Sequence, residues 1–336
     1  DPRLKDSLQL KEEDKLSIIG AGEGDDLEAF ITSNVKIEIN GVVANAKSFA
    51  VLSEDVLHLS NYVGIPVHGI LGYDFFSSFV VKINFITRRI TLYKPETYRQ
   101  RGNYISMPIT IERNKPYVVI PTAINDNTKL SLKYIIDTGA GHALSLETES
   151  HPKLTVPKPA LRAQVGRGLS GNINGYLGRI KNLELKTYNL KNVLASFPDH
   201  AEFGSKTTVA RNGNIGLELL KRFHLILDYS RSAIYLKPNS MIKDPFEHDM
   251  SGIELIAGGE NFHRYIIYSV HPGSPADEAG LKAGDEIISI DWTLVSKLNL
   301  TRISKLLHSY HGRNLTFFVK RGSELFTTTV TLQRQI

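Results

Sequence analysis

Short runs of alternating apolar and polar residues dominate the first 240 positions of the chain. The clearest runs are 79–85 (FVVKINF), 89–93 (RITLY), 117–122 (YVVIPT) and 225–229 (LILDY). Turn-forming residues bound each run, and a period of two is typical of strands with one buried face. Short helices are expected at 74–78 and 217–222. The pattern therefore predicts an all-β fold over this part of the chain.

A duplicated stretch indicates that these strands form two related lobes. Residues 69–95 (GILGYDFFSSFVVKINFITRRITLYKP) resemble residues 213–238 (GNIGLELLKRFHLILDYSRSAIYLKP). Three pairs share a spacing of 144 residues: Gly72 and Gly216, Phe79 and Phe223, Asn84 and Asp228. Two copies this far apart are too long and too few for a solenoid, so a pair of duplicated lobes is expected.

The candidate chemistry lies where an apolar strand runs into Asp137-Thr138-Gly139. The tripeptide alone is weak evidence for a catalytic site, because it also fits an ordinary strand that ends in a turn. The order of the segments is more specific than the tripeptide. A strand leads into Asp-Thr-Gly-Ala, a glycine-rich hairpin follows, and Asn214-Ile215-Gly216 then precedes a short helix. In this order, residues 103–238 resemble one lobe of a pepsin- or retropepsin-like aspartic peptidase. Residues 1–98 resemble a second, incomplete lobe.

The resemblance implies that Asp137 is one of two catalytic carboxylates. Two carboxylates about 3 Å apart share one proton, so that one activates water as a base while the other acts as an acid. Thr138 would lock the loop through its hydroxyl, and Gly139 would let two such loops approach closely. Gly72 and Gly216 would support the loops. The flap that closes on the substrate would contain Gly166, Gly168, Leu169, Ser170 and Gly171.

The repeat places the second carboxylate outside the 336 residues. Gly216 lies 79 residues after Asp137, and the same step back from Gly72 gives 72 − 79 = −7. Three alternatives follow. An upstream segment carries a second Asp-Thr-Gly-like loop, two Asp137 motifs pair in a dimer as in retropepsins, or the first lobe is degenerate and inactive.

The last part of the chain has a different character. Residues 273–287 (GSPADEAGLKAGDEI) closely resemble a bacterial-type PDZ domain. Strands are expected at 286–291, 315–319 and 325–332, with a helix at 302–310. The resemblance implies that an extended peptide binds by strand addition. The expected groove residues are Arg264, Tyr265, Ile266 and Ile267.

The sequence does not predict capture of a terminal carboxylate by this PDZ domain. The loop that would hold it should precede Ile266, and residues 261–265 show no Gly-Leu-Gly-Phe-like signature. Arg264 offers a charge for a carboxylate, although a solvated surface arginine explains it as well. The alternative is a module that packs against the lobes and gates their cleft.

Composition excludes several functional classes. The chain has no cysteine, which excludes disulfides, thiolate metal sites and cysteine nucleophiles. Its histidines show no metal-binding spacing, and the glycines at 166–171 lead into no helix, so no metal or dinucleotide cofactor is expected. The net charge of +5 is diffuse, with 10 − 11 = −1 in residues 243–336, so nucleic acid is not an expected partner. No apolar run is long enough to span a bilayer.

The sequence thus predicts two pepsin- or retropepsin-like all-β lobes followed by a small α+β PDZ domain. The predicted limits are an incomplete lobe at 1–98, a lobe with Asp-Thr-Gly at 99–240, a linker at 241–250 and the PDZ domain at 251–336. The predicted function is an aspartic endopeptidase that acts on polypeptides. An inactive scaffold that presents peptides through its PDZ domain is the competing prediction. The resemblance to bacterial proteins implies a periplasmic, cell-envelope or secreted location.

Overall fold

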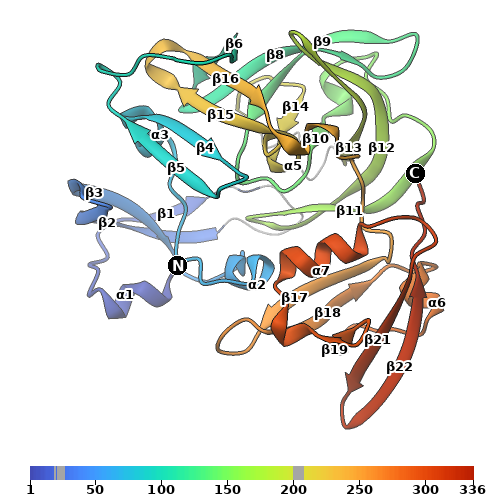
Figure 1. The fold of residues 1–336 in the computed structure, drawn as a ribbon. Helices are drawn as coiled ribbons and strands as arrows, with labels where there is room; N and C mark the ends of the chain where they lie inside the picture. Colours follow the sequence, from blue (N-terminus) through green and yellow to red (C-terminus); the bar gives the residue numbers. More distant parts are fainter. Residues whose placement is uncertain (19, 21–26, 200–207) are drawn as a thin grey trace. The chain divides into compact units, whose positions relative to one another are not determined.

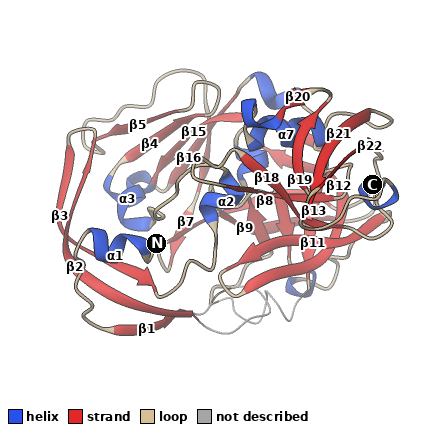
Figure 2. Ribbon diagram, turned by 90° about the horizontal axis from the view of Figure 1, so that it is seen from below, coloured by secondary structure: helices blue, strands red, loops and turns tan. Residues whose placement is uncertain are grey.

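The computed structural model describes residues 1–18, 20, 27–199 and 208–336. These residues form two compact units. The terminal unit contains residues 1–69 and 247–335 within the described ranges, and the central unit contains residues 70–246. Strands predominate in both units (Figure 1, Figure 2), which confirms the predicted β-rich class. Among the described residues, none of the helices combines the length and apolar character needed to span a membrane.

The described part of the central unit contains thirteen strands and several short helices. Its first strands are β4 (Val80–Asn84), β5 (Arg89–Tyr93), β6 (Ile105–Pro108), β7 (Thr110–Glu112), β8 (Lys115–Ala123), β9 (Lys129–Ile136) and β10 (Leu144–Leu146). The others are β11 (Ala160–Gly168), β12 (Gly171–Leu185), β13 (Tyr188–Pro198), β14 (Gly213–Ile215), β15 (Phe223–Asp228) and β16 (Ala233–Pro238). Its helices are α3 (Tyr73–Ser78), α5 (Leu217–Leu220), η1 (Thr148–Ser150), η3 (Tyr229–Arg231) and η4 (Ser240–Lys243).

Eight strands of the central unit form a sheet that closes on itself. The strand order is β11-β12-β13-β10-β14-β9-β8-β7, and an extra pairing joins β12 to β8. The inward side chains form one apolar core with members such as Tyr134, Leu144, Ile180 and Phe197, all under 3% exposed. Each fully buried side chain of this size stabilises the fold by about 1.5–3 kcal/mol. The closed sheet is therefore a rigid support for the loops at its strand ends.

The two copies of the repeat meet in a second sheet of the central unit, with the strand order β5-β4-β15-β16-β6. Strands β4 and β15 are antiparallel, and Lys82 pairs with Ile226 at their centre. These two residues are 226 − 82 = 144 positions apart, which is the repeat spacing. The copies are therefore related by an approximate two-fold axis through this pair.

The same turn chemistry ends the inner strand of each copy. Asn84 accepts hydrogen bonds from the backbone N–H groups of Ile86 and Thr87 at 3.1 and 3.2 Å. Its counterpart Asp228 accepts from the N–H of Arg231 at 3.1 Å and is fully buried. A short polar side chain that bonds backbone two or three residues on is a common turn device. The repeated Asn/Asp position is thus explained by structure alone.

The N-terminal part of the terminal unit is a three-stranded sheet with two short helices. Its elements are α1 (Arg3–Ser7), β1 (Lys15–Ile18), β2 (Leu27–Ile39), β3 (Val42–Leu52) and α2 (Leu59–Val63). The strands follow the order β1-β2-β3, and the turn between β2 and β3 contains Gly41. Contacts place residues 1–69 with the C-terminal segment, while 70–98 belong to the central unit. The domain limits drawn from the sequence stay predictions.

The C-terminal part of the terminal unit is a sheet with a helix on one side. Its elements are β17 (Ile253–Gly258), β18 (Arg264–Val270), α6 (Pro275–Glu278), β19 (Glu286–Ile290), β20 (Thr293–Leu294), η5 (Val295–Lys297), α7 (Leu300–Leu307), β21 (Asn314–Arg321) and β22 (Glu324–Thr331). The order is β17-β18-β19-β21-β22, with β20 on β19. Helix α7 begins two residues before the prediction, because the Asn299 side chain caps it by accepting the N–H of Arg302 at 2.9 Å.

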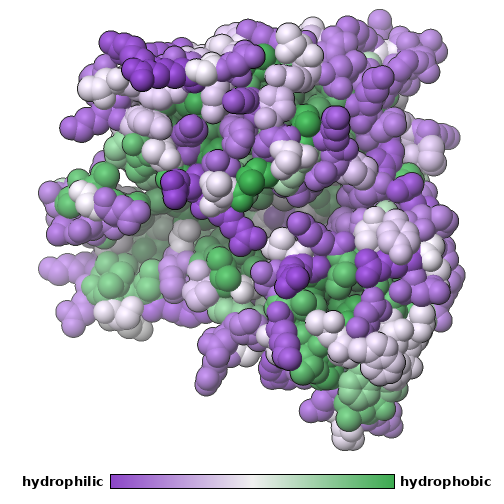
Figure 3. Space-filling view, viewed as in Figure 1, coloured by the Kyte–Doolittle hydropathy of each residue, from purple (hydrophilic) through white to green (hydrophobic). Residues whose placement is uncertain are grey.

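Most of the surface drawn in Figure 3 is polar, and the visible apolar residues gather in small patches. Exposed apolar side chains of the C-terminal segment include Leu294 and Leu325, at 46% and 59%. Two further exposed side chains precede the first repeat copy's glycine: Ile70 and Leu71, at 71% and 42%. Scattered apolar residues are ordinary on a protein surface, but two adjacent ones next to a repeat glycine call for a physical explanation.

Candidate active site and peptide-binding edge

Asp137 stands at the end of β9, in a loop that packs on β14. Strand β14 lies between β9 and β10, parallel to the first and antiparallel to the second. The backbone N–H of Asp137 donates to the carbonyl of Ile215 at 2.9 Å, and the N–H of Leu217 donates to the carbonyl of Ala140 at 2.7 Å. The loop is therefore fixed on both sides of the carboxylate by a segment about 80 residues away in sequence.

Both carboxylate oxygens of Asp137 are held by donors. The backbone N–H of Gly139 donates to Oδ1 at 2.8 Å, and Nδ2 of Asn214 donates to Oδ2 at 3.3 Å. Hydrogen bonds to a carboxylate orient it and limit its rotation. Asp137 is half-buried, so the carboxylate still reaches the surface. This geometry suits a group that must present its oxygens to a substrate or a water.

His142 adds a second titratable group beside this carboxylate. Burial lowers the pKa of the His142 imidazole, while the neighbouring charge of Asp137 and the Asn214 side chain act in the opposite direction. Nε2 of His142 and Oδ1 of Asn214 are both buried and have no other hydrogen-bond partner among the described residues, so the two side chains partner each other beside the Asp137 carboxylate. His142 is not predictable from the sequence, because a lone histidine carries no motif.

Gly216 is required by the close approach of the Asp137 loop. A Cβ at this position would lie 2.2 Å from the carbonyl oxygen of His142 and 2.7 Å from that of Ala140. Both distances are far shorter than any side-chain contact, so only glycine fits. The expected role of Gly216 as a support for the loop is thus consistent with its packing.

Gly72, the counterpart of Gly216, has an open environment. No described atom lies within 4 Å of the position that its Cβ would occupy. Ile70 and Leu71, which precede it, are exposed, whereas Ile215 of the second copy is 2% exposed. The two copies therefore differ in one respect: a carboxylate-bearing loop packs on Gly216, and no described residue packs on Gly72 in the same way.

The family resemblance also implies roles for Thr138 and Gly139 in the Asp137 loop. Thr138 is half-buried, and the locking of the loop through its hydroxyl stays a prediction. Gly139 is exposed, and a Cβ at this position would meet Oδ1 of Asp137 at 3.3 Å and no other described atom within 4 Å. Within the described ranges, no second loop approaches Gly139.

The predicted flap corresponds to the hairpin of β11 and β12. Gly168 pairs with Gly171, which has a φ of +110°, and Leu169 and Ser170 form the turn between them. A bulge shifts the register between Gln164 and Gly166. Bulges increase local twist and are common next to active sites. Closure of this hairpin over Asp137 stays a prediction.

The expected PDZ groove at Arg264–Ile267 needs correction, because this segment lies in the middle of the sheet. Strand β18 pairs with β17 on one side and with β19 on the other. Arg264 is held in a bidentate ion pair with Glu286, at 2.9 and 2.8 Å. Strand addition needs an unpaired edge. The sheet ends at β17 on one side and at β22 on the other, and β17 is the edge strand next to β18.

The loop that precedes β17 holds a carboxylate of its own. Oδ1 of Asp249 accepts hydrogen bonds from the backbone N–H groups of Ser251 and Gly252 at 2.9 and 2.7 Å. The N–H of Ile253 donates to the Ser251 hydroxyl at 3.2 Å. All three amides at the start of the edge strand are therefore engaged within the chain.

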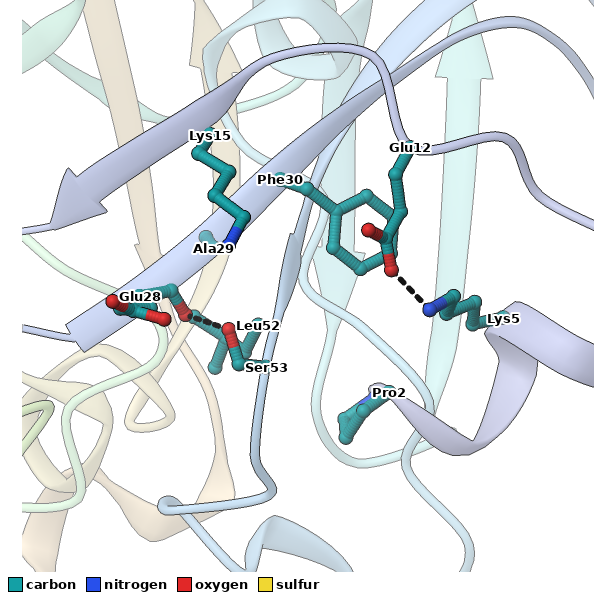
Figure 4. Close-up of a pocket in the computed structure, with 9 residues that line it drawn as sticks. All are labelled: Pro2, Lys5, Glu12, Lys15, Glu28, Ala29, Phe30, Leu52 and Ser53. Carbon is teal, nitrogen blue, oxygen red and sulfur yellow. Dashed lines mark hydrogen bonds and ion pairs between the residues drawn. The ribbon is translucent and has the colours of Figure 1, made fainter.

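A small pocket elsewhere in the terminal unit carries no catalytic arrangement (Figure 4). It has a volume of about 180 Å³ and is lined by Pro2, Lys5, Glu12, Lys15, Glu28, Ala29, Phe30, Leu52 and Ser53. Lys5 pairs with Glu12 and lies 5.4 Å from the centre of the Phe30 ring. Ligand pockets usually have volumes of about 300–1,000 Å³. Among the described residues, no cluster of three or more metal-ligating side chains is found.

Comparison with known proteins identifies the C-terminal segment. Residues 266–321 match the family model of the PDZ domain, so the chain carries a PDZ domain at its C-terminal end. The C-terminal processing peptidase, chloroplastic, of Tetradesmus obliquus is 32% identical over 85 residues, which are 25% of this chain and 18% of that protein. The chain thus matches about a fifth of the length of this curated relative.

Two solved structures are less similar to this chain than the curated relative is. A retropepsin-like aspartic protease from Rickettsia conorii is 17% identical, with a TM-score of 0.28, over 42% of this chain and 96% of that chain. An HtrA-type protease, AlgW with decapeptide, is 12% identical, with a TM-score of 0.29, over 74% of this chain and 85% of that chain. At these TM-scores neither likeness carries an argument about the site, which rests on its own geometry.

Proposed function

We propose that the protein is an aspartic endopeptidase whose PDZ domain binds polypeptide. The observation that carries the proposal is the Asp137 loop: a carboxylate at a strand end, held by Gly139 and Asn214, with Gly216 fitted against the loop. A fixed, accessible carboxylate is half of the pair that activates water against an amide. No cofactor is needed for this reaction, because water is the nucleophile.

The second carboxylate is proposed to come from a polypeptide segment that packs on Ile70, Leu71 and Gly72. The two-fold relation of the copies supports this position for a second loop, because Gly72 is the counterpart of Gly216. The exposure of Ile70 and Leu71 and the open space at Gly72 leave room for such a segment. Covering two large apolar side chains would stabilise the loop by about 25 cal/mol per Å² buried.

Pairing of two Asp137 loops from two copies is less well supported. Such a dimer would place a second β15 across the two-fold axis from the first. That position is already taken by β4, which pairs with β15 from His224↔Asn84 to Asp228↔Val80. The partner loop is therefore assigned to the Gly72 side of the central unit.

Hydrolysis of an unfolded, fluorescence-quenched polypeptide tests the proposal. Activity of the native protein is measured between about pH 3 and 7, and a statine-type transition-state mimic is expected to block it. Asp137→Asn is expected to lower kcat by at least about 10³-fold with an unchanged melting temperature. Asp126→Asn, in an exposed turn, is the matched control and should retain full activity.

The inactive-scaffold alternative predicts a different result. Hydrolysis that is absent in the wild type, or equal in wild type and Asp137→Asn, would leave peptide presentation as the function. A rate that rises with the square of the protein concentration would instead favour the dimer. The proposed cell-envelope or secreted location is tested separately by fractionation of the native cells.

A further inference from the structure

The free edge of the PDZ domain is contacted by a helix of the same terminal unit. Helix α2 lies beside β17 in Figure 1. Nδ2 of Asn61 donates to the backbone carbonyl of Ala257 at 2.8 Å, across 196 residues of sequence. Because β17 ends the sheet, this carbonyl is one that an added strand would use. Asn61 therefore fills a ladder position with a side-chain amide.

Two neighbours of Asn61 in sequence contact β18 and α7, the elements next to β17. Tyr62 meets Tyr268 of β18 edge-to-face, with ring centres 6.3 Å apart. The backbone of Gly64, at a φ of +75°, approaches α7 so closely that a Cβ there would lie 3.1 Å from Cδ1 of Leu300. The segment thus touches the edge strand and the first residue of the helix that faces it, which are the two walls of a PDZ groove.

The docked segment has a fixed shape of its own. The N–H of Gly64 donates to the carbonyl of Ser60 at 2.8 Å and ends the helix. The Ser60 hydroxyl accepts the N–H of Val67 at 2.9 Å, and Ser60 is 2% exposed. A preorganised loop loses little conformational entropy when it docks. This favours a stable contact with β17 over a passing one.

The backbone amides at the start of β17 indicate whether the groove binds a chain terminus or an internal chain segment. A terminal carboxylate would need the amides of Ser251, Gly252 and Ile253, and these are already bonded to Asp249 and the Ser251 hydroxyl. A second carboxylate beside that of Asp249 would be repelled. A segment from within a chain has no terminal charge and meets no such obstacle.

We propose that this PDZ domain binds internal chain segments and that its resident occupant is the segment 58–64 of the same chain. A polypeptide that adds to β17 must displace Asn61 from Ala257, so external binding and docking of the segment 58–64 exclude each other. The apparent affinity for an added peptide is then reduced by the fraction of molecules in which the segment is docked. This inference rests on the PDZ domain and does not require the peptidase activity.

A cross-linking experiment tests the docking in the full chain. The chain has no native cysteine, so Tyr62→Cys with Tyr268→Cys gives a single reactive pair. A short bismaleimide is expected to join the pair within minutes, and the added substitution Gly64→Ile is expected to slow the reaction at least about tenfold by strain and by collision with Leu300. Gly41→Ile, at a φ of +81° with no neighbour, is the matched control and should not slow it.

A binding experiment tests the competition. The probe is a labelled synthetic peptide of residues 55–68 (DVLHLSNYVGIPVH), prepared as a free acid and as an amide. Gly64→Ile and Asn61→Asp, which removes the donor to Ala257, should each bind it at least about tenfold tighter than the wild type or Gly41→Ile. The acid and the amide should bind equally. Equal affinity of all four proteins, an unslowed cross-link in Gly64→Ile, or a clear preference for the acid would each overturn the proposal.

Discussion

The side chain of Asn214 lies 3.3 Å from the carboxylate of Asp137, although 77 residues separate the two in sequence. This contact links β14 to the loop after β9 and fixes the oxygen Oδ2. Replacing Asn214 by leucine keeps the approximate size and removes the donor. We expect kcat for peptide hydrolysis to fall about tenfold to a hundredfold, with a smaller change in KM, because a freely rotating carboxylate is misplaced in the transition state. An Asn214→Leu protein with wild-type kcat would contradict this role.

The two repeat glycines offer a matched pair of substitutions. Gly216→Ala forces a Cβ to 2.2 Å from the carbonyl of His142, whereas Gly72→Ala meets no described atom within 4 Å. We expect Gly216→Ala to destabilise the central unit by about 1–3 kcal/mol and Gly72→Ala to change its stability by less than about 0.5 kcal/mol. Urea unfolding monitored by circular dichroism measures both. A large loss of stability for Gly72→Ala would contradict the open environment of Gly72.

An ion pair between the buried Asp285 and the partly exposed Arg321 gives the PDZ domain a pH-dependent stability. Burial raises the pKa of Asp285, but the hydrogen bonds from Arg321 and from the N–H of Lys282 outweigh it, so the pKa is lowered below its usual 3.8. Arg321 donates to both oxygens at 2.7 Å. A lowered carboxyl pKa contributes stability that is present above pH 3.8 and lost as the pH falls through the folded-state pKa.

The substitution Asp285→Asn should therefore cost about 1–3 kcal/mol at pH 7 and progressively less below pH 3.8. Urea titrations at about pH 7, 4 and 2.5 compare the two proteins. Glu278→Gln, at an exposed carboxylate in the short helix α6, serves as the control. An equal loss at every pH would show that packing, and not charge, carries the effect.

Arg222 is 1% exposed and binds backbone carbonyls that include those of Glu218, Met241 and Pro245. Its guanidinium also lies 3.6 Å from the centre of the Phe246 ring. Lysine cannot supply the same planar set of donors, so Arg222→Lys should destabilise the central unit by about 2–4 kcal/mol. The neighbouring Lys221→Met, at a partly exposed ion pair, should change the stability by less than about 1 kcal/mol. Thermal and urea unfolding separate the two outcomes.

Features that depend on local pattern were predictable from the sequence. The repeat spacing matches the pairing of β4 with β15, and the strand that ends before Asp137 is followed by the expected loop. The turn residues around Ser274 and Gly280 located α6, because a serine cap and a glycine end are local signals. These elements are determined by residues within a few positions of one another.

Features that depend on strand order were not predictable in this way. The sequence indicated Arg264–Ile267 as groove residues but could not show that β17 and β19 cover both edges of β18. The contact of Asn61 with Ala257 and the bonding of Asp249 to its loop have no motif, because side-chain amides and carboxylates near turns are common. Such contacts are determined by the assembled sheet, and only the structure reveals them.

The pairing of Lys82 with Ile226 also determines when, during synthesis, the second sheet of the central unit can form. Strand β4 cannot be completed until β15 has been synthesised 144 residues later, which takes roughly 7–30 s at ribosomal speeds of about 5–20 residues per second. During that interval Val80 and Val81, both fully buried in the finished protein, have no β15 to pair with. The nascent chain therefore exposes an unpaired, apolar strand edge that can associate with other chains. A chaperone that covers β4 during synthesis would raise the yield of folded protein more than one that acts after the chain has left the ribosome.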